Sequence, residues 1–154
     1  MEIRYWILEI GGWKMEEIVP GLVGEIEMVV REENTARHLG TRSSWTKYRG
    51  GNVAVLATPE MIRLMEKAAV AAVDHLLADG YRTVGVEVNV RHLAATPVGM
   101  RVRAQAELTA VEGRKLTFRA EAFDEAEKIG EGEHKRVIID LERFRERVEA
   151  KREE

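Results

Sequence analysis

Three side chains that could take part in acid, base or nucleophile chemistry belong to one predicted helix and the strand that follows it: Thr58, Glu66 and His92. Glu66 interrupts a mostly apolar segment, where a charged side chain costs free energy unless it is paired or useful. His92 ends an alternating segment, and an imidazole can accept or donate a proton near neutral pH. A hydroxyl, a carboxylate and an imidazole together could attack and break an acyl bond.

The hydroxyl and the carboxylate belong to one predicted helix, which begins near Thr58 and continues to about Leu77. We expect Thr58 to be the N-cap residue, because Pro59 suits the first helical position. Apolar residues cover more than half of the helix surface, which indicates a buried helix. Glu66 is eight residues after Thr58, a distance of roughly 12 Å along a straight helix. Either Thr58 lies on a segment that folds back, or the working Thr58 comes from a partner subunit.

The histidine ends a predicted strand that covers residues 81–92 and alternates with a period of two. Four valines share one face, and the residues between them share the other: Val84, Val86, Val88 and Val90 against Thr83, Gly85, Glu87, Asn89 and Arg91. His92 has the parity of the valines. If the valines pack on the helix, His92 points at the helix too, toward Glu66.

Four further strands are predicted, over residues 21–35, 100–111, 116–122 and 129–140, and a charged helix is predicted after Leu141. One buried helix wrapped by a curled antiparallel sheet of about five strands is the hotdog arrangement, an α+β fold. Such a sheet leaves an edge strand open, and pairing with a second copy would cover it. We expect an N-terminal extension over residues 1–14 and a single hotdog domain over residues 15–154.

The composition excludes several classes of protein. The 154 residues include no cysteine, so disulfides, thiolate nucleophiles and cysteine metal sites are excluded. The net charge of −3 argues against a general nucleic-acid binder, and no apolar run is long enough to span a membrane. A cytoplasmic protein with no metal site is therefore expected. The irregular segment 37–52, with its cations Arg42, Lys47 and Arg49, is either a solvated connector or a lid over a ligand.

Four segments in register carry a resemblance to a known family: VLATPEMIRLME (55–66), HLAATPVG (92–99), AELTAVEGR (106–114) and GEHKRV (132–137). Together they resemble the fluoroacetyl-coenzyme A thioesterase-like family of hotdog proteins, and the resemblance extends from about residue 17 to residue 149. The threonine, glutamate and histidine of the family pattern fall on Thr58, Glu66 and His92. Its strand glycine falls on Gly85 and its late arginine on Arg136.

The resemblance implies hydrolysis of an acyl-coenzyme A thioester by a homodimer, or a higher homo-oligomer, with two sites at the subunit interface. It implies no cofactor, because coenzyme A is part of the substrate. The fluoroacetate-specific enzyme has a phenylalanine in a lid where this chain has Asn52, so we expect a general acyl-CoA thioesterase. The predicted catalytic residues are Thr58, Glu66 and His92, and the predicted substrate-binding residues are Gly85, Arg136 and Asn52.

The sequence leaves the roles within this site open. His92 is the expected general base and acid, Glu66 either orients His92 or attacks the carbonyl, and Thr58 is a nucleophile or a positioning hydroxyl. Backbone N–H groups at Gly85 or at the helix start could bind the oxyanion. Arg136 is either structural or contacts the phosphates of coenzyme A.

Ordinary structural roles compete with this interpretation. Taken alone, Thr58 would be an N-cap, Glu66 an ion-pair partner at an interface and His92 a core histidine. Their joint match to one family pattern favours a site. The rival function is a non-catalytic acyl-CoA or small-ligand binding protein on the same scaffold. A hydratase or dehydratase is less favoured, because no motif for it is present.

Overall fold

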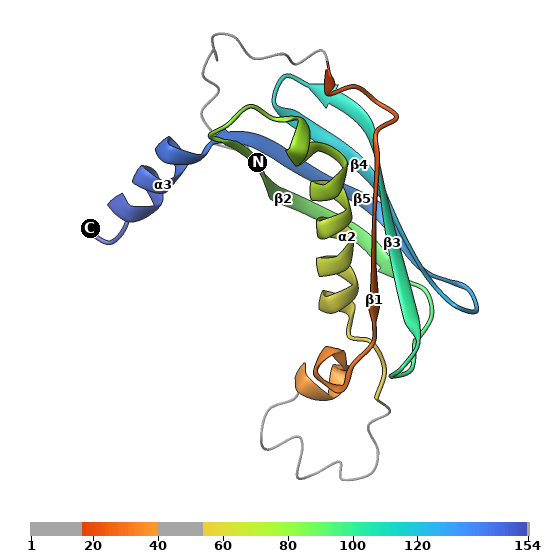
Figure 1. Cartoon of the computed structure of the whole chain (residues 1–154). Helices are drawn as coiled ribbons and strands as arrows, with labels where there is room; N and C mark the ends of the chain where they lie inside the picture. The colour runs from red at the N-terminus through yellow and green to blue at the C-terminus, as the bar shows by residue number, and fades with distance from the viewer. Residues whose placement is uncertain (1–16, 40–53, 154) are drawn as a thin grey trace.

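The computed structural model describes residues 17–39 and 54–153, which form an antiparallel five-stranded sheet curled around one long helix (Figure 1). The strands are β1 (Val23–Val29), β2 (Tyr81–His92), β3 (Arg101–Glu112), β4 (Lys115–Asp124) and β5 (Lys128–Asp140). Their order across the sheet is β1-β3-β4-β5-β2, so β1 and β2 lie at the two edges. The predicted fold class is confirmed. The predicted extension over residues 1–14 lies outside the described residues.

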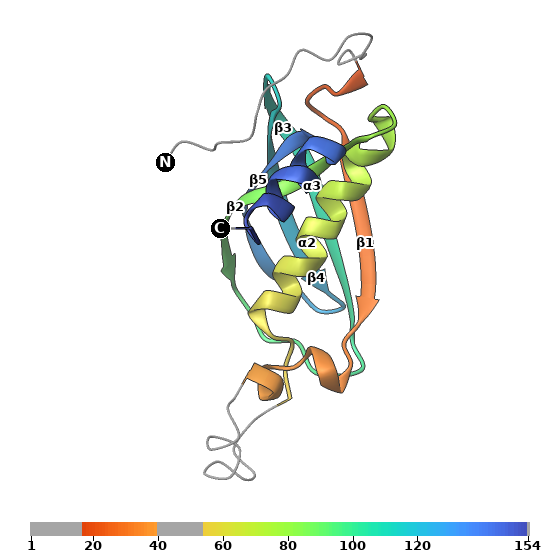
Figure 2. The same ribbon diagram turned by 90° about the vertical axis from the view of Figure 1, so that its left-hand side faces the viewer.

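Helix α2 (Thr58–Val73) lies against one face of the sheet, as the two views in Figures 1 and 2 show. Apolar residues on several faces of α2 are buried: Met61, Leu64, Met65, Ala68, Ala69, Ala72 and Val73. They pack in one core with strand residues such as Phe118 and Leu108. Removing this apolar surface from water is the main driving force for placing the helix inside the curl.

The ends of α2 differ from the sequence prediction. Ala57 is the N-cap residue and no side chain caps the helix, so Thr58 is already helical and its hydroxyl is not used as a cap. At the other end α2 stops at Val73, and a short 3-10 turn covers Asp74–Leu76. The carboxylate of Asp74 accepts hydrogen bonds from the backbone and side chain of Thr83 on β2, which holds this turn against the sheet.

The first predicted strand was too long. Strand β1 ends at Val29, and two 3-10 turns follow at Glu32–Asn34 and Ala36–Leu39. The sequence pattern extended the prediction past Val29 because Val30, which lies beyond the strand, is also an apolar core residue. At the far end of the chain, helix α3 (Leu141–Ala150) follows β5 and projects away from the sheet (Figure 1).

A bulge in β2 changes the faces on which its residues lie. The pairing register with β5 shifts between Gly85 and Glu87, which leaves Val86 as the extra residue. Before the bulge, Thr83 and Gly85 face α2, whereas after it Val90 and His92 do. The prediction that Thr83 and Gly85 face away from the helix was therefore wrong, and the prediction for His92 is confirmed.

Strand β1 contacts the helix closely at Gly24. A methyl group placed there would come within 2.0 Å of the Ala68 carbonyl oxygen and 2.5 Å of the Ala72 nitrogen, both in the backbone of α2. Neither atom can move without displacing the helix. We therefore predict that Gly24→Ala lowers the free energy of unfolding by about 3 kcal/mol, the upper part of the range for overpacked cores.

Urea unfolding checks this prediction, and Glu27→Ala on the same strand is the control. Glu27 is exposed, so its removal should change the free energy of unfolding by less than about 0.5 kcal/mol. Equal stability of the two variants would show that β1 does not pack tightly on α2.

Candidate active site

The structure brings two of the three predicted catalytic residues into contact. The Oγ1 atom of Thr58, in the first turn of α2, lies 2.8 Å from Nδ1 of His92 at the end of β2. Thr58 is exposed and His92 is half-buried, so the pair lies at the surface. A hydroxyl hydrogen-bonded to an imidazole is the arrangement in which the imidazole can remove the hydroxyl proton.

The other ring nitrogen of His92 is enclosed. Nε2 of His92 is buried and has no hydrogen-bond partner within residues 17–39 and 54–153. A buried polar nitrogen without a partner is uncommon in a folded protein, and functional sites are one place where it occurs. His92 therefore contacts Thr58 through Nδ1, while its Nε2 is enclosed and has no partner among the described residues.

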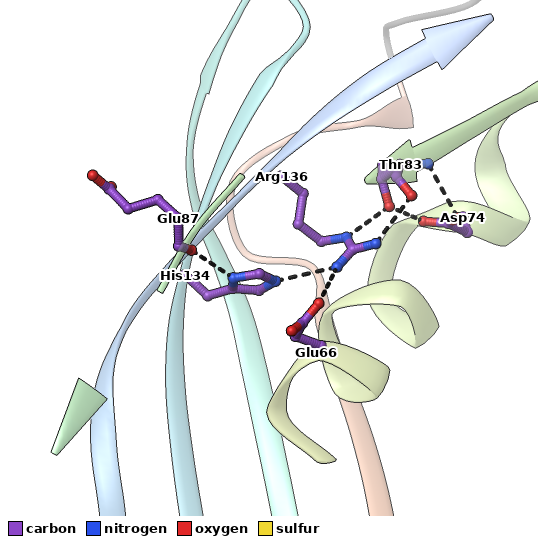
Figure 3. A network of polar contacts seen from close by, with 6 residues as sticks. All are labelled: Glu66, Asp74, Thr83, Glu87, His134 and Arg136. Atoms are coloured by element: carbon purple, nitrogen blue, oxygen red, sulfur yellow. Dashed lines mark hydrogen bonds and ion pairs between the residues drawn. The ribbon is translucent and has the colours of Figure 1, made fainter. Parts of the chain in front are cut away.

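Glu66 lies in a second polar cluster, eight residues after Thr58 along α2. Its Oε2 atom is 3.3 Å from Nη1 of Arg136, whose side chain is only 7% exposed. Arg136 also donates from Nε to the Thr83 hydroxyl at 2.8 Å and from Nη2 to the Thr83 carbonyl at 3.0 Å. Figure 3 shows these contacts converging on the guanidinium. Burial lowers the pKa of Arg136, while the carboxylates of Asp74 and Glu66 act in the opposite direction.

The predicted substrate-binding glycine lies directly over this cluster. A methyl group added to Gly85 would come within 2.9 Å of Oε2 of Glu66 and within 3.3 Å of Nη1 of Arg136. The missing side chain therefore leaves the carboxylate and the guanidinium room to meet. Gly85 and Arg136 are also paired residues of β2 and β5.

His134 belongs to the same cluster but was not among the predicted site residues. It is 1% exposed, its Nδ1 is 2.8 Å from the Glu87 carbonyl oxygen, and its Nε2 is 3.2 Å from Nη1 of Arg136. Burial is the largest effect and lowers the pKa of His134; the hydrogen bond to the Glu87 carbonyl raises this pKa, and the Arg136 cation lowers it. The available signal was its spacing, since His134 and Arg136 share one face of a strand otherwise rich in buried apolar residues.

Among the described residues of one chain, no hydrogen bond joins Glu66 to Thr58 or His92. Glu66 and Thr58 both lie on the single helix α2, so about 12 Å of helix separates their backbones. The expectation that His92 points at Glu66 of the same chain was wrong. His92 faces the first turn of α2, where Thr58 is its partner.

A hollow of about 340 Å³ between β1 and α2 is lined by none of the predicted site residues. Its charged residues have both signs: Glu27, Arg31, Glu33, Glu60, Arg63 and Lys67. It therefore has no excess positive charge that would select a phosphate, and we do not assign it to the site.

Asn52 and the segment with Arg42, Lys47 and Arg49 lie outside the described residues, as do the predicted lid contacts. Within the described part of the chain, no group of three or more His, Asp or Glu residues could hold a metal ion. In the same residues, no helix is long and apolar enough to cross a membrane.

Comparison with known proteins agrees with this fold. The family model for the fluoroacetyl-CoA-specific thioesterase matches residues 30–142. The fluoroacetyl-CoA thioesterase of Streptantibioticus cattleyicolor is 40% identical over 126 residues, which cover 81% of this chain and 88% of that protein. A solved structure of a fluoroacetyl-CoA thioesterase has 37% identity and a TM-score of 0.76, over 86% of this chain and 96% of that one.

Two other solved structures support the same architecture. A Thermus thermophilus hypothetical protein of the thioesterase superfamily has 33% identity and a TM-score of 0.73, over 88% of this chain and 99% of that one. A hot-dog-like protein from Thermanaerovibrio acidaminovorans, at 22% identity, has the same TM-score of 0.73 over 86% of this chain and 91% of that one, and shows the fold alone. Fold and relatives together define a hotdog-fold thioesterase. More narrowly, the chain belongs to the fluoroacetyl-CoA-specific thioesterase family, which confirms the expected family and enzyme class.

The environment of His134 predicts a pH dependence of stability. The unfolded chain gains a proton on this ring near the ordinary pKa of 6.5, whereas the native state, with its lowered pKa, binds that proton only at lower pH. Between the two pKa values the unfolded state binds more protons, so the free energy of unfolding falls as the pH drops below about 6.5. His134→Gln should remove this part of the pH dependence.

Urea unfolding between about pH 5 and pH 8 measures the effect, because this is the range in which ordinary histidines titrate. His75→Gln, at an exposed position, is the matched control for the replacement of a histidine by glutamine. The interpretation fails if His134→Gln and wild type lose stability in parallel on acidification.

Proposed function

We propose that this protein hydrolyses an acyl-CoA thioester to a free acid and coenzyme A, as a homodimer with two equivalent sites. The observation that carries the proposal is the 2.8 Å contact between the Thr58 hydroxyl and Nδ1 of His92. The relative from Streptantibioticus cattleyicolor is a fluoroacetyl-CoA thioesterase, which supports a CoA thioester as the substrate class. No cofactor is required, because all proton transfers can be made by side chains and water.

In the proposed reaction His92 is the general base and then the general acid. If Thr58 is the nucleophile, its proton passes to Nδ1 of His92 as the oxygen attacks the thioester carbonyl. The C–S bond then breaks, and the imidazolium returns the proton to the departing thiolate, which leaves as free coenzyme A. Water, activated by the same imidazole, hydrolyses the acyl-enzyme. Attack by Glu66, or by water held by Thr58, remains an alternative path to the same products.

We place the missing carboxylate across a subunit interface. Within one chain α2 holds Glu66 about 12 Å from Thr58, whereas a second copy can bring the partner's Glu66 to the Thr58–His92 pair at the surface. The described sheet has β2 at an edge, and Val88 in that strand is 40% exposed. Exposed edge strands can pair with another chain, so we expect β2 to form the dimer interface.

Arg136 and Gly85 are proposed to support this chemistry rather than to perform it. Arg136 is buried and fixes the direction of the Glu66 carboxylate, and Gly85 leaves room for their contact. The Gly85 N–H is also a candidate oxyanion donor. At the helix start, the N–H groups of Glu60 and Met61 already donate to the Ala57 carbonyl. We further propose a cytoplasmic location. Because Asn52 stands where the fluoroacetate-specific enzyme has its lid phenylalanine, we propose a general acyl-CoA thioesterase rather than one specific for fluoroacetyl-CoA.

Release of free thiol from a panel of acyl-CoAs tests the proposed reaction. The panel contains acetyl, fluoroacetyl, branched, aromatic and long-chain thioesters. We predict turnover by wild type and a loss of at least about 100-fold in kcat for His92→Ala, because general acid–base catalysis contributes about 10²–10⁴-fold. Binding of acyl-CoA without thiol release on any member would favour the non-catalytic binding protein instead.

The space over Gly85 gives a second prediction. Gly85→Ala places a methyl group 2.9 Å from Oε2 of Glu66, so the carboxylate must move away from Arg136. We expect kcat to fall by about tenfold or more, since small misplacements in a site are costly. Ala78→Gly, at an exposed position, is the control for a change of the same size. Unchanged kcat in Gly85→Ala would show that the position of the Glu66 carboxylate does not matter for the reaction.

A further inference from the structure

His134 occupies a position with no assigned role, between the backbone of β2 and the guanidinium of Arg136 (Figure 3). It is 1% exposed, and both of its ring nitrogens have partners. Nδ1 is 2.8 Å from the Glu87 carbonyl oxygen, and Nε2 is 3.2 Å from Nη1 of Arg136. The ring also lies 6.3 Å from the ring of Phe118, measured between centroids.

The two partners determine the protonation state of the ring. A carbonyl oxygen can only accept a hydrogen bond, so Nδ1 must carry the proton and donate it to Glu87. A guanidinium can only donate, so Nε2 must be unprotonated and accept from Arg136. The contacts therefore require a neutral imidazole with the proton on Nδ1. A doubly protonated ring would direct an N–H group at the Arg136 cation.

Together with Thr83, His134 fixes the orientation of the Arg136 guanidinium. Thr83 accepts from Nε and from Nη2, which fixes one edge of the planar guanidinium. The hydroxyl of Thr83 in turn donates to Asp74. On the other edge, Nη1 contacts both Nε2 of His134 and Oε2 of Glu66. Glu66 has a side chain that is 41% exposed, so its direction depends on a rigid partner.

We propose that His134 is a positioning residue of the thioesterase site, which holds Nη1 of Arg136 as a neutral hydrogen-bond acceptor and thereby directs the Glu66 carboxylate. The proposal rests on the proposed function, in which Glu66 takes part in the reaction. It differs from a space-filling role for the ring, because it requires an acceptor atom at the position of Nε2 and not only a side chain of suitable volume.

Two substitutions separate the contacts of His134. In His134→Gln the amide oxygen can reach the position of Nε2 and accept from Arg136. In His134→Asn the amide nitrogen can replace Nδ1 and donate to Glu87, but the side chain is too short to reach Arg136. We expect His134→Gln to retain kcat within about threefold and His134→Asn to lose about tenfold or more, with smaller changes in KM, because the reacting geometry is disturbed.

The Arg136→Gln background shows whether His134 acts through Arg136. There the acceptor has no guanidinium to hold, so His134→Asn should cause no further loss of kcat; residues that act as one unit give non-additive losses. Thermal unfolding identifies any variant that fails to fold. Two results would overturn the proposal: a folded His134→Asn with wild-type kcat, or losses of kcat that multiply in the double variant.

A readout independent of turnover distinguishes failure of this proposal from failure of the proposed function. The ¹⁵N imidazole signals of His134 in the wild-type protein should be those of a neutral ring protonated at Nδ1. The guanidinium protons of Arg136 should exchange with water more slowly in wild type and His134→Gln than in His134→Asn. A ring protonated at Nε2, or equal exchange in all three proteins, would contradict the proposal even if no acyl-CoA is hydrolysed.

Discussion

The bulge at Val86 is the constraint on which the arrangement of both polar clusters depends. In a regular strand, Thr83 and His92 would face opposite sides of the sheet, because side chains alternate with a period of two. One extra residue between Gly85 and Glu87 inverts the alternation. As a result, the first half of β2 presents Thr83 and the open space at Gly85 to α2, and the second half presents His92 to the start of the same helix. Without the bulge only one of these clusters could face the helix.

The cluster around Arg136 connects the helix to the edge of the sheet. Burying a guanidinium is costly unless its charge is compensated and its donors are occupied. Here Thr83, Glu66 and His134 occupy donors on Nε, Nη1 and Nη2, and Asp74 adds a second carboxylate through Thr83. These residues come from the middle of α2, from the 3-10 turn that follows it, and from strands β2 and β5. The cluster therefore fixes both the height and the rotation of the helix relative to β2, which also determines where Thr58 meets His92.

Much of the fold follows from local pattern, whereas the details of the site do not. The alternation in β2 and the apolar surface of α2 predicted these elements and the hotdog fold, and the four matching segments predicted the family. The bulge was not predictable, because Val86 continues the valine alternation without a break. Thr58 before Pro59 is typical of an N-cap, but contact with His92, remote in sequence, uses its hydroxyl instead. The role of His134 depends on its contacts with Arg136 and Glu87, and the contact with Glu87 joins residues that are far apart in the sequence.

We propose that one subunit supplies Thr58 and His92 to each site and that the other supplies Glu66. The most direct test mixes two inactive proteins, His92→Ala and Glu66→Gln, and allows their subunits to exchange. In a mixed dimer, a site shared across the interface has one copy with both mutations and one copy with neither. We predict recovery of about one quarter of wild-type thiol release after random exchange of a two-fold symmetric dimer. No recovery, with mixed dimers confirmed by native mass spectrometry, would show that each site is complete within one chain and would rule out a shared site.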